Sequence, residues 1–574
     1  MANALEAASL VMIPSGYENG TLGSLKPLDG SGDFTFTRGS DISATRVNED
    51  GYIEKGYENT LLGSNDWAQS DSQYEITGGE VGYDGTNDAW LVNKLAAAYF
   101  SKDALVLAGV MTISFFAKAG SLDRVFVFIG GDAARFDLTN ATAVTAGGNP
   151  VSQNIELVSG TTDWYRCSIV INKTSTQNFL IKPQNSSNQD VTGTIYIQDA
   201  MLNQGMVSYP YVETTTAPVA GGILEDEPRL DYSGGASCPS LLLEPQRTNF
   251  ITQSEYIDGS YWTKDRVTIS NNATTSPEGK LNASKIIEDS QNGIHRIFRT
   301  ISGTNNVLSF FAKADERQWI SVFSSDASYS YFNVGDGTLG TIASGSTATI
   351  EDYGNGWYRC SLHNFYSSSA IINITTGNGD AAYQGDGTSG LYIYGIQVEQ
   401  ATYPTSYIPT YGTSQTRLRD NVNRLDISSL AATYQTLFIE ASVFSVSTTQ
   451  YKFSINDATG SRTNRFTIFI NNDDLLLLVN SQGSSQPAIA QSDYISVNTT
   501  YKIAAVVRDG SYALFANGTK IGEQVGTTPS NLNSLTFGDA SSPNNQSWYG
   551  DVNQTLVFPT ALSDDECIAL TTIS

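Results

Sequence analysis

One pattern occurs twice in the 574 residues of this chain, and it constrains the fold more than any other feature. SFFAKA at Ser114–Ala119 returns at Ser309–Ala314, and WYRCS at Trp164–Ser168 returns at Trp357–Ser361. The segments that follow the two WYRCS motifs also occur in the same order in both copies. Each copy of about 160 residues is too long for a solenoid repeat and suits a complete domain. The repeat therefore predicts two related domains in tandem.

The local pattern inside both copies is that of β-strands. TISFFAK, GTIYIQ and GLYIYGIQVEQ are short, rich in β-branched and aromatic residues, and bounded by Gly, Asn, Asp and Ser. We find no long amphipathic helical pattern. The expected fold class is all-β, built as tandem antiparallel β-sandwich domains of the jelly-roll type.

The C-terminal part of the chain has a different pattern. Asp509-Gly510 and Asn517-Gly518 each stand between strand-like runs, which predicts consecutive hairpins. Together with Phe537-Gly538, with Trp548 and Gly550, and with ALSDDE at Ala561–Glu566, this stretch resembles laminin-G-like or concanavalin-like sandwiches. The resemblance covers roughly residues 430–574 and implies a third sandwich.

Charge and apolar content exclude several classes of function. The net charge is −26, so the chain should repel nucleic acid and anionic lipid. The first residues lack a basic segment, and we expect no secretory signal. The longest apolar run, Ala104–Ala117, is shorter than the ~20 residues of a membrane span. The cysteines, Cys167, Cys238, Cys360 and Cys567, form no CxxC motif and are expected to be buried free thiols.

Three stretches resemble virion proteins of tailed bacteriophages: Ile13–Gly56, Arg229–Asn249 and Tyr392–Arg417. The resemblance implies a head or tail fibre or spike subunit that is made in the host cytoplasm and displayed on the virion surface. It also implies a homotrimer whose N-terminal region contacts capsid or tail proteins. No heptad pattern supports the trimer independently.

These observations divide the chain into six parts. We expect an attachment segment at 1–56, jelly-roll modules at 57–217 and 247–414, and a concanavalin-like sandwich at 430–574. Linkers are predicted at 218–246 and 415–429, and neither has the low-complexity composition of a flexible tether.

Enzyme chemistry finds little support in the motifs. The chain has just two histidines, His295 and His363, and it lacks HExxH, GxSxG and P-loop patterns. We therefore expect no enzyme. A polysaccharide depolymerase that uses two carboxylates remains an alternative, because such enzymes need only Asp and Glu in proximity.

Glycan binding is the sharper hypothesis, because exposed aromatic rings stack on sugar faces. The candidate ligand-binding residues are Tyr261, Trp262, Trp319, Trp548 and Tyr549. The repeated Trp164 and Trp357 are interpreted instead as packing residues. Neutral glycans suit the acidic chain better than anionic ones.

Calcium is the one cofactor considered, as a structural ion. Asp380 and Asp386 lie in a Gly-rich loop and are the candidate metal ligands, and Asn471–Asp474 offers a second oxygen cluster. Neither loop has EF-hand spacing, and solvated turns are the favoured interpretation. The leading hypothesis is thus a phage fibre or spike subunit that adheres to host-surface carbohydrate. The alternatives are a decoration protein without a ligand and a depolymerase.

Overall fold

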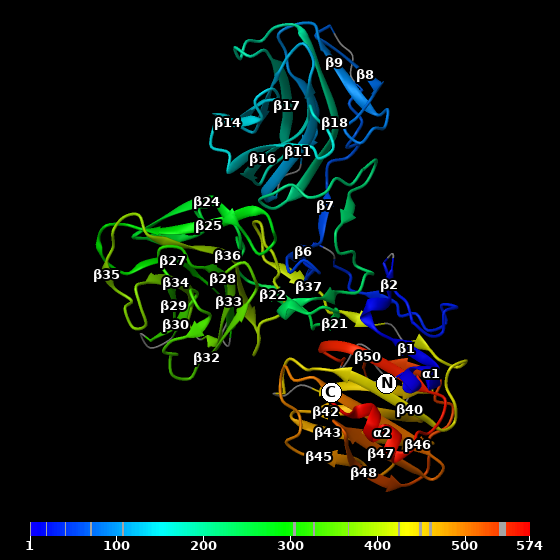
Figure 1. The fold of residues 1–574 in the computed structure, drawn as a ribbon. Helices are drawn as coiled ribbons and strands as arrows, with labels where there is room; N and C mark the ends of the chain where they lie inside the picture. Colours follow the sequence, from blue (N-terminus) through cyan, green and yellow to red (C-terminus); the bar gives the residue numbers. More distant parts are fainter. Residues whose placement is uncertain are drawn as a thin grey trace.

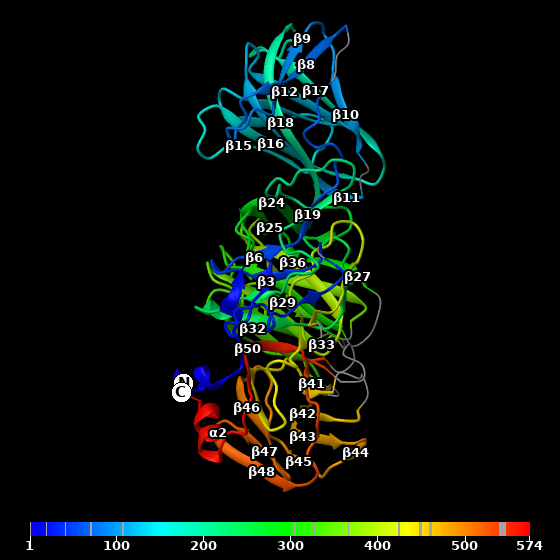
Figure 2. The same cartoon turned by 90° about the vertical axis from the view of Figure 1, so that its right-hand side faces the viewer.

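The computed structural model describes residues 2–573 apart from 19, 41, 69–71, 106–107, 302–305, 325–327, 366, 423–424, 447–449, 458–461 and 539–546. Three β-sandwiches surround a central region, which consists of short strands from the N-terminal segment and the two linkers (Figure 1). The first jelly roll lies at one end of the molecule and the C-terminal sandwich at the other, as both views show (Figure 2). The expectation of an all-β chain with antiparallel sandwiches is confirmed.

The first sandwich has the strand order of a jelly roll. One sheet runs β15-β16-β11-β18-β9-β8 and the other β10-β17-β12-β13-β14, so the chain crosses repeatedly between the two sheets, as in a jelly roll built from two Greek keys. The strands are β8 (Tyr74–Glu80), β9 (Ala89–Lys94), β10 (Phe100–Leu105), β11 (Gly109–Ala119), β12 (Arg124–Ile129), β13 (Asp132–Asp137), β14 (Thr142–Gly147), β15 (Ser152–Leu157), β16 (Trp164–Lys173), β17 (Gln177–Gln184) and β18 (Gly193–Gln204).

The second sandwich repeats this order, with sheets β24-β25-β36-β28-β33-β32 and β23-β27-β34-β29-β30-β31. A two-stranded ribbon of β26 and β35 lies beside them. The strands are β23 (Thr263–Asp265), β24 (Val267–Thr275), β25 (Leu281–Glu288), β26 (Asn292–Gly293), β27 (His295–Thr300), β28 (Asn306–Lys313), β29 (Trp319–Phe323), β30 (Tyr329–Asn333), β31 (Thr338–Leu339), β32 (Thr347–Asp352), β33 (Trp357–Phe365), β34 (Ser369–Thr375), β35 (Tyr383–Gln384) and β36 (Gly390–Gln400).

The two repeated motifs pair with each other in the same register in both jelly rolls. Phe115 on β11 lies opposite Cys167, and Phe310 on β28 lies opposite Cys360. All four side chains are buried between the sheets. The repeated sequence therefore encodes the same central strand pair and the same core layer in each domain.

The C-terminal sandwich begins after residue 424. Its sheets run β20-β21-β50-β40-β46-β47-β48 and β39-β49-β41-β42-β43-β44, with β1 beside β50 and β45 beside β43. Its own strands are β39 (Leu425–Asp426), β40 (Gln435–Ala441), β41 (Gln450–Asn456), β42 (Arg465–Asn471), β43 (Asp474–Ser481), β44 (Ser484–Ser485), β45 (Ile489–Gln491), β46 (Tyr501–Arg508), β47 (Ser511–Ala516), β48 (Thr519–Val525), β49 (Ser534–Thr536) and β50 (Gly550–Phe558).

Local signals define two features of this sandwich. Asn517 and Gly518 both have positive φ, 46° and 76°, as the tight turn between β47 and β48 requires. The predicted hairpins β46-β47 and β47-β48 are confirmed. Helix α2 (Asp564–Thr571) begins with a capping box in which the side chains of Ser563 and Glu566 satisfy each other's backbone N–H groups.

The N-terminal segment and the two linkers are built into the fold. Strand β1 (Leu10–Met12) pairs with β50, and the β20–β21 hairpin (Leu230–Asp231 and Ser240–Leu243) pairs with the same strand. The two chain termini consequently lie side by side on the C-terminal sandwich (Figures 1 and 2). The other elements here are α1 (Ala2–Ala7), η1 (Pro14–Gly16), β2 (Tyr17–Glu18), β3 (Thr21–Leu22), β4 (Phe36–Thr37), β5 (Thr45–Val47), β6 (Ile53–Lys55), β7 (Tyr57–Asn59), β19 (Val219–Gly221), η2 (Ser233–Gly235), β22 (Arg247–Asn249), β37 (Gln415–Arg417) and β38 (Asn421–Val422).

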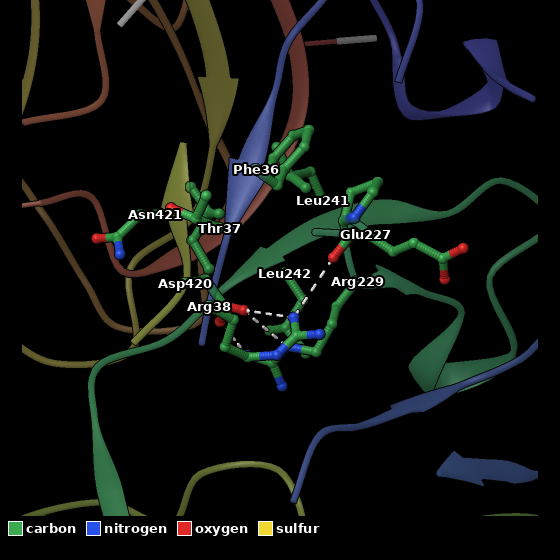
Figure 3. Close-up of a pocket in the computed structure, with 11 residues that line it drawn as sticks. Phe36, Thr37, Arg38, Glu227, Arg229, Leu241, Leu242, Asp420 and Asn421 are labelled. Carbon is green, nitrogen blue, oxygen red and sulfur yellow. Dashed lines mark hydrogen bonds and ion pairs between the residues drawn. The ribbon is translucent and has the colours of Figure 1, made fainter. Parts of the chain in front are cut away.

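A buried charge network, the arginine node, holds these segments together, and Figure 3 shows its members Arg38, Arg229 and Asp420. Arg229 donates to Glu244 at 2.7 Å and pairs with both oxygens of Asp420, while Arg38 donates to Asp420 at 3.2 Å. Arg417 lies 3.0 Å from Glu244. Arg38 belongs to the N-terminal segment and the other members to the two linkers, so the node joins three distant stretches of chain.

The helices and the cysteines bear on two further expectations, the absence of a membrane span and the burial of the thiols. Neither α1 nor α2 is long and apolar enough to cross a bilayer, and no other α-helix is described. Cys167, Cys360 and Cys567 are buried free thiols as expected. Cys238 is exposed, which corrects the expectation of burial, because it lies in the turn of the β20–β21 hairpin.

Candidate functional site

A cleft of about 1010 Å³ lies where the central region, the second jelly roll and the C-terminal sandwich meet, and we refer to it as the junction cleft. The central region contributes Asp50 and residues 231–235. The second jelly roll contributes parts of β32 and β33 and the loop at 402–406, and the C-terminal sandwich contributes the loops at 442–446 and 497–500. Ligand sites are concentrated at such domain junctions.

Half-buried aromatic rings line the junction cleft from three parts of the chain. Tyr232 comes from the central region, Tyr353 and Tyr403 from the second jelly roll, and Phe444 from the C-terminal sandwich. The rings of Tyr403 and Phe444 are 6.1 Å apart, between centroids, and tilted by 42°. This contact joins the two sandwiches at the wall of the cleft.

Acidic groups dominate the charge of the junction cleft. Among the described residues, six carboxylates line it, against a single arginine, Arg359. The acids are Asp50, Asp231, Glu244, Glu351, Asp352 and Asp551. The guanidinium of Arg359 already donates to Ser309 Oγ and to the Thr405 carbonyl, so it offers the cleft little free positive charge.

The Asp551 carboxyl group has the most strongly shifted pKa among the acids of the cleft. Burial and then the charge of nearby Asp231 raise the pKa of Asp551 to about 7, against hydrogen bonds from Ser240 and Ser442 that lower it. Asp231 accepts hydrogen bonds from the backbone N–H groups of Val47 and Ser233. The cleft therefore holds one carboxyl group that titrates near neutral pH beside a second, hydrogen-bonded one.

His363 also lines the cleft. Its Nδ1 lies 3.2 Å from the Thr402 carbonyl, and burial lowers the pKa of the imidazole, with the charge of Arg359 acting in the same direction. The neutral ring with a proton on Nδ1 fits this contact. His363 thus fixes the 402–406 loop that forms one wall.

The glycan candidates of the second jelly roll lie away from the junction cleft. Trp262 is 2% exposed and its Nε1 donates to the Gln253 carbonyl, so it is a core residue without a free ring face. Tyr261 is half-buried, and the Arg299 guanidinium covers its ring at 4.2 Å. Trp319 is half-buried on β29.

The candidates of the C-terminal sandwich are also part of the packing. Trp548 is 1% exposed, and its Nε1 donates to the Ser442 carbonyl at 3.0 Å. Tyr549 is half-buried against Tyr451. The rings of Trp262 and Trp548 have no face open to a sugar, which corrects their proposed role in stacking. The interpretation of Trp164 and Trp357 as packing residues is confirmed by exposures of 3% and 1%.

The calcium candidates do not converge in the described residues. Asp380 is exposed, and the Asp386 carboxylate accepts from the backbone and side chains of Thr388 and Ser389 in its own turn. Neither belongs to a group of three possible ligands there. Asp473, Asp474 and Asp493 do bring carboxylate oxygens within 4.8 Å of one another. The calcium prediction stays a prediction.

The junction cleft was missed by sequence reasoning. Its lining residues come from seven separate stretches of the chain, and no motif marks them. One signal was available: three aromatic residues, Tyr232, Tyr353 and Tyr403, follow or precede strand-like runs in polar turns. Which turns meet depends on the packing of the central region.

Comparison with solved structures finds β-sandwich proteins. The CBM40 domain of the Ruminococcus gnavus IT-sialidase, bound to α2,3 sialyllactose, is 21% identical, with a TM-score of 0.23 over 26% of this chain and 91% of that chain. A leech intramolecular trans-sialidase is 19% identical, with a TM-score of 0.22 over 25% and 24%. A heptameric SAP-like pentraxin of Limulus polyphemus is 17% identical, with a TM-score of 0.21 over 24% and 69%.

Comparison of sequences identifies the C-terminal sandwich. No curated protein matches the chain. Residues 436–567 match the laminin-G-like family described as the concanavalin A-like lectin/glucanases superfamily. The matched range runs from β40 to α2 and includes both predicted hairpins. Residues 436–567 are therefore a concanavalin A-like domain, as the turn and strand pattern of this region predicted.

Proposed function

We propose that this protein binds a neutral oligosaccharide in the junction cleft. The observation that carries the proposal is the joint presence of half-buried aromatic rings and polar side chains in one large cleft between two sandwiches. Sugars present apolar C–H faces that stack on aromatic rings, and hydroxyl groups that donate to carboxylates. Tyr403 and Phe444 supply such rings, and exposed Glu351 and Asp352 supply acceptors.

The charge of the cleft selects among glycans. A ligand carboxylate placed about 4 Å from one cleft carboxylate meets a repulsion of roughly 1–4 kcal/mol between the limits of water and a protein surface. Glu244 is already paired with Arg229 and Arg417, but the other acids of the cleft face a single engaged arginine, so little positive charge compensates that repulsion. Neutral oligosaccharides are therefore favoured over sialylated or uronic-acid glycans.

Glycan-array binding of the purified full chain tests the proposal, followed by calorimetry with a neutral oligosaccharide from the array. Tyr403→Ala and Phe444→Ala should each weaken binding about tenfold, which corresponds to ~1.4 kcal/mol. The matched control is Tyr99→Ala, since Tyr99 is an exposed ring on the first jelly roll. Binding that survives both cleft variants, or that favours sialyllactose, contradicts the proposal.

We further propose a structural role on the surface of a phage virion, as a head or tail fibre or spike subunit. This part rests on the sequence resemblance of Ile13–Gly56 and Tyr392–Arg417 to virion proteins. Contacts to capsid or tail proteins through the N-terminal region would place the concanavalin-like domain nearest the particle, because β1 pairs with β50. The chain would then act as a homotrimeric adhesin and not as an enzyme.

Localisation on purified particles by immunogold labelling and cryo-EM tests the virion role. Label on the capsid or tail in three copies per site supports it, and absence from the particles excludes it. Presence on the particle without binding on the glycan array would indicate a decoration protein that has no ligand.

A second candidate function follows from Asp551 and Asp231. A carboxyl group with a pKa of about 7 beside a hydrogen-bonded carboxylate is the pairing that glycoside hydrolases use as acid and base. A depolymerase would release reducing ends from the polysaccharide that the cleft binds, and Asp551→Asn would abolish the release. Binding without release leaves the adhesive function.

A further inference from the structure

A lysine and two glutamates meet in a fully buried cluster that the junction cleft does not include. Lys55, at the end of β6, has its Nζ 2.6 Å from Glu255 Oε1 and 2.6 Å from Glu278 Oε2. The three side chains are 1%, 1% and 4% exposed. Glu255 follows β22, and Glu278 lies in the turn between β24 and β25. The cluster thus connects the central region to the second jelly roll.

Tyrosines enclose the cluster and keep water out. The rings of Tyr394, Tyr407 and Tyr411 lie 5.3, 5.6 and 5.9 Å from Lys55 Nζ, and all three side chains are buried. The Tyr394 hydroxyl is 2.6 Å from both Nζ and Glu278 Oε2. The Tyr407 hydroxyl donates to Glu255 Oε1 at 3.0 Å. The amine and the two carboxyl groups are buried among these rings.

The cluster carries one more acid than its single cation can neutralise. Burial raises the pKa of Glu255 above its usual range, although the charge of Lys55 opposes this, and the charge of Glu278 adds to the rise. Glu255 Oε2 is buried and has no hydrogen-bond partner among the described residues. These conditions favour a protonated Glu255 beside an ammonium–carboxylate pair of Lys55 and Glu278.

We propose that Lys55 and Glu278 condense to an intramolecular amide, with Glu255 as the residue that transfers the proton. A proton first passes from the Lys55 ammonium to the Glu278 carboxylate, which leaves a neutral amine and a carboxylic acid. The Nζ lone pair attacks Glu278 Cδ, and the Nζ–Cδ bond forms. Glu255 accepts a proton from Nζ and gives its own to the departing hydroxyl. The Cδ–O bond breaks, one water leaves, and Glu255 ends unchanged.

Two physical effects drive this reaction in the folded chain. Groups held in contact react with effective molarities on the order of 10⁵–10⁸ M, which offsets the unfavourable equilibrium of amide formation in water. Condensation also removes two buried charges, which are unfavourable away from water. The product would fasten β6 covalently to the second jelly roll, a link that resists heat and mechanical load.

The intact mass of the denatured full chain shows whether the amide has formed, and this measurement needs no variant. We expect a mass lower than that of the sequence by one water, about 18 Da, as a covalent modification requires. Proteolysis and tandem mass spectrometry should then recover a branched peptide that joins Lys55 to Glu278. An unmodified mass overturns the proposal, and a branch located at Glu255 overturns the assignment of roles.

Variants separate the proton-transferring role of Glu255 from a structural one. Lys55→Arg keeps the charge but cannot form the amide, and Glu255→Gln keeps both reacting groups but removes the proton transfer. Both should restore the unmodified mass. The matched control is Lys94→Arg, because Lys94 is also buried but contacts a single acid, Asp190. This variant should retain the loss of water. If the Glu255→Gln variant loses one water to the same extent as the wild type, Glu255 does not transfer the proton.

Discussion

The main chain of Leu10 is the antiparallel partner of Val557, so the beginning of the chain completes the sheet of its last domain. The Leu10 side chain is fully buried in the core of the concanavalin A-like domain. Leu10→Ala should therefore lower the free energy of unfolding by roughly 2–5 kcal/mol, the usual cost of a leucine cavity. Urea unfolding followed by circular dichroism measures it.

Leu28→Ala is the matched control, because Leu28 belongs to the same segment and is 89% exposed. It should change the free energy of unfolding by less than about 0.5 kcal/mol. Equal effects of the two substitutions would show that β1 adds nothing to the stability of the domain.

Features with a local cause were predictable from the sequence. The strand runs and the Asn517-Gly518 turn depend on side-chain patterns and on backbone preferences a few residues long. The repeat located the central strands of both jelly rolls because each copy carries the same core layer. These parts of the fold agree with the structure.

Long-range placement could not be predicted in the same way. Nothing local to Leu10 specifies pairing with a strand at the other end of the chain. Trp262 and Trp548 both occur near strand edges, where an aromatic ring packs inward or outward equally well, and their burial is decided by distant residues. The junction cleft likewise exists because loops of separate domains meet around the arginine node.

Removal of Arg229 should destabilise the central region. Its loss leaves Glu244 and Asp420 buried with fewer partners, and breaking a buried ion pair in this way costs about 3–5 kcal/mol. Burial alone would raise the pKa of Glu244, but the charges of Arg417 and Arg229 outweigh it and lower the pKa to about 2. Guanidinium unfolding of Arg229→Met at pH 7 measures the effect.

Arg266→Met serves as the comparison, since the Arg266 side chain is 39% exposed and pairs with a partly exposed acid. Exposed pairs contribute about 0–1 kcal/mol. A similar small effect at Arg229 would mean that the node is not needed for stability.

The thiols should differ sharply in reactivity. Cys238 is exposed, whereas Cys167, Cys360 and Cys567 are buried, and burial raises the pKa of each buried thiol. Because the thiolate is the reactive form, a thiol reagent should modify one cysteine in the native protein and all four after denaturation. Cys238→Ser should remove the native reaction completely. Modification of more than one thiol in the folded chain would contradict the burial of the other three.

Asp551 should make stability depend on pH near neutrality. Its pKa rises from an ordinary value of 3.8 to about 7 on folding, so the folded state binds more protons between these values. The stability that the protonated group contributes is then fully present below about pH 4 and is lost as pH rises through 7. Asp551→Asn resembles the protonated form and avoids this loss.

The difference in unfolding free energy between Asp551→Asn and the wild type should be near zero at pH 4 and reach roughly 4 kcal/mol in favour of the variant at pH 8, because each pKa unit corresponds to about 1.4 kcal/mol. Melting temperatures from pH 4 to pH 8 measure it. The comparison is Asp50→Asn, because Asp50 lines the same cleft but is exposed. A flat profile for Asp551→Asn would show that burial beside Asp231 does not hold a proton on this group, and would remove the basis for an acid catalyst in the cleft.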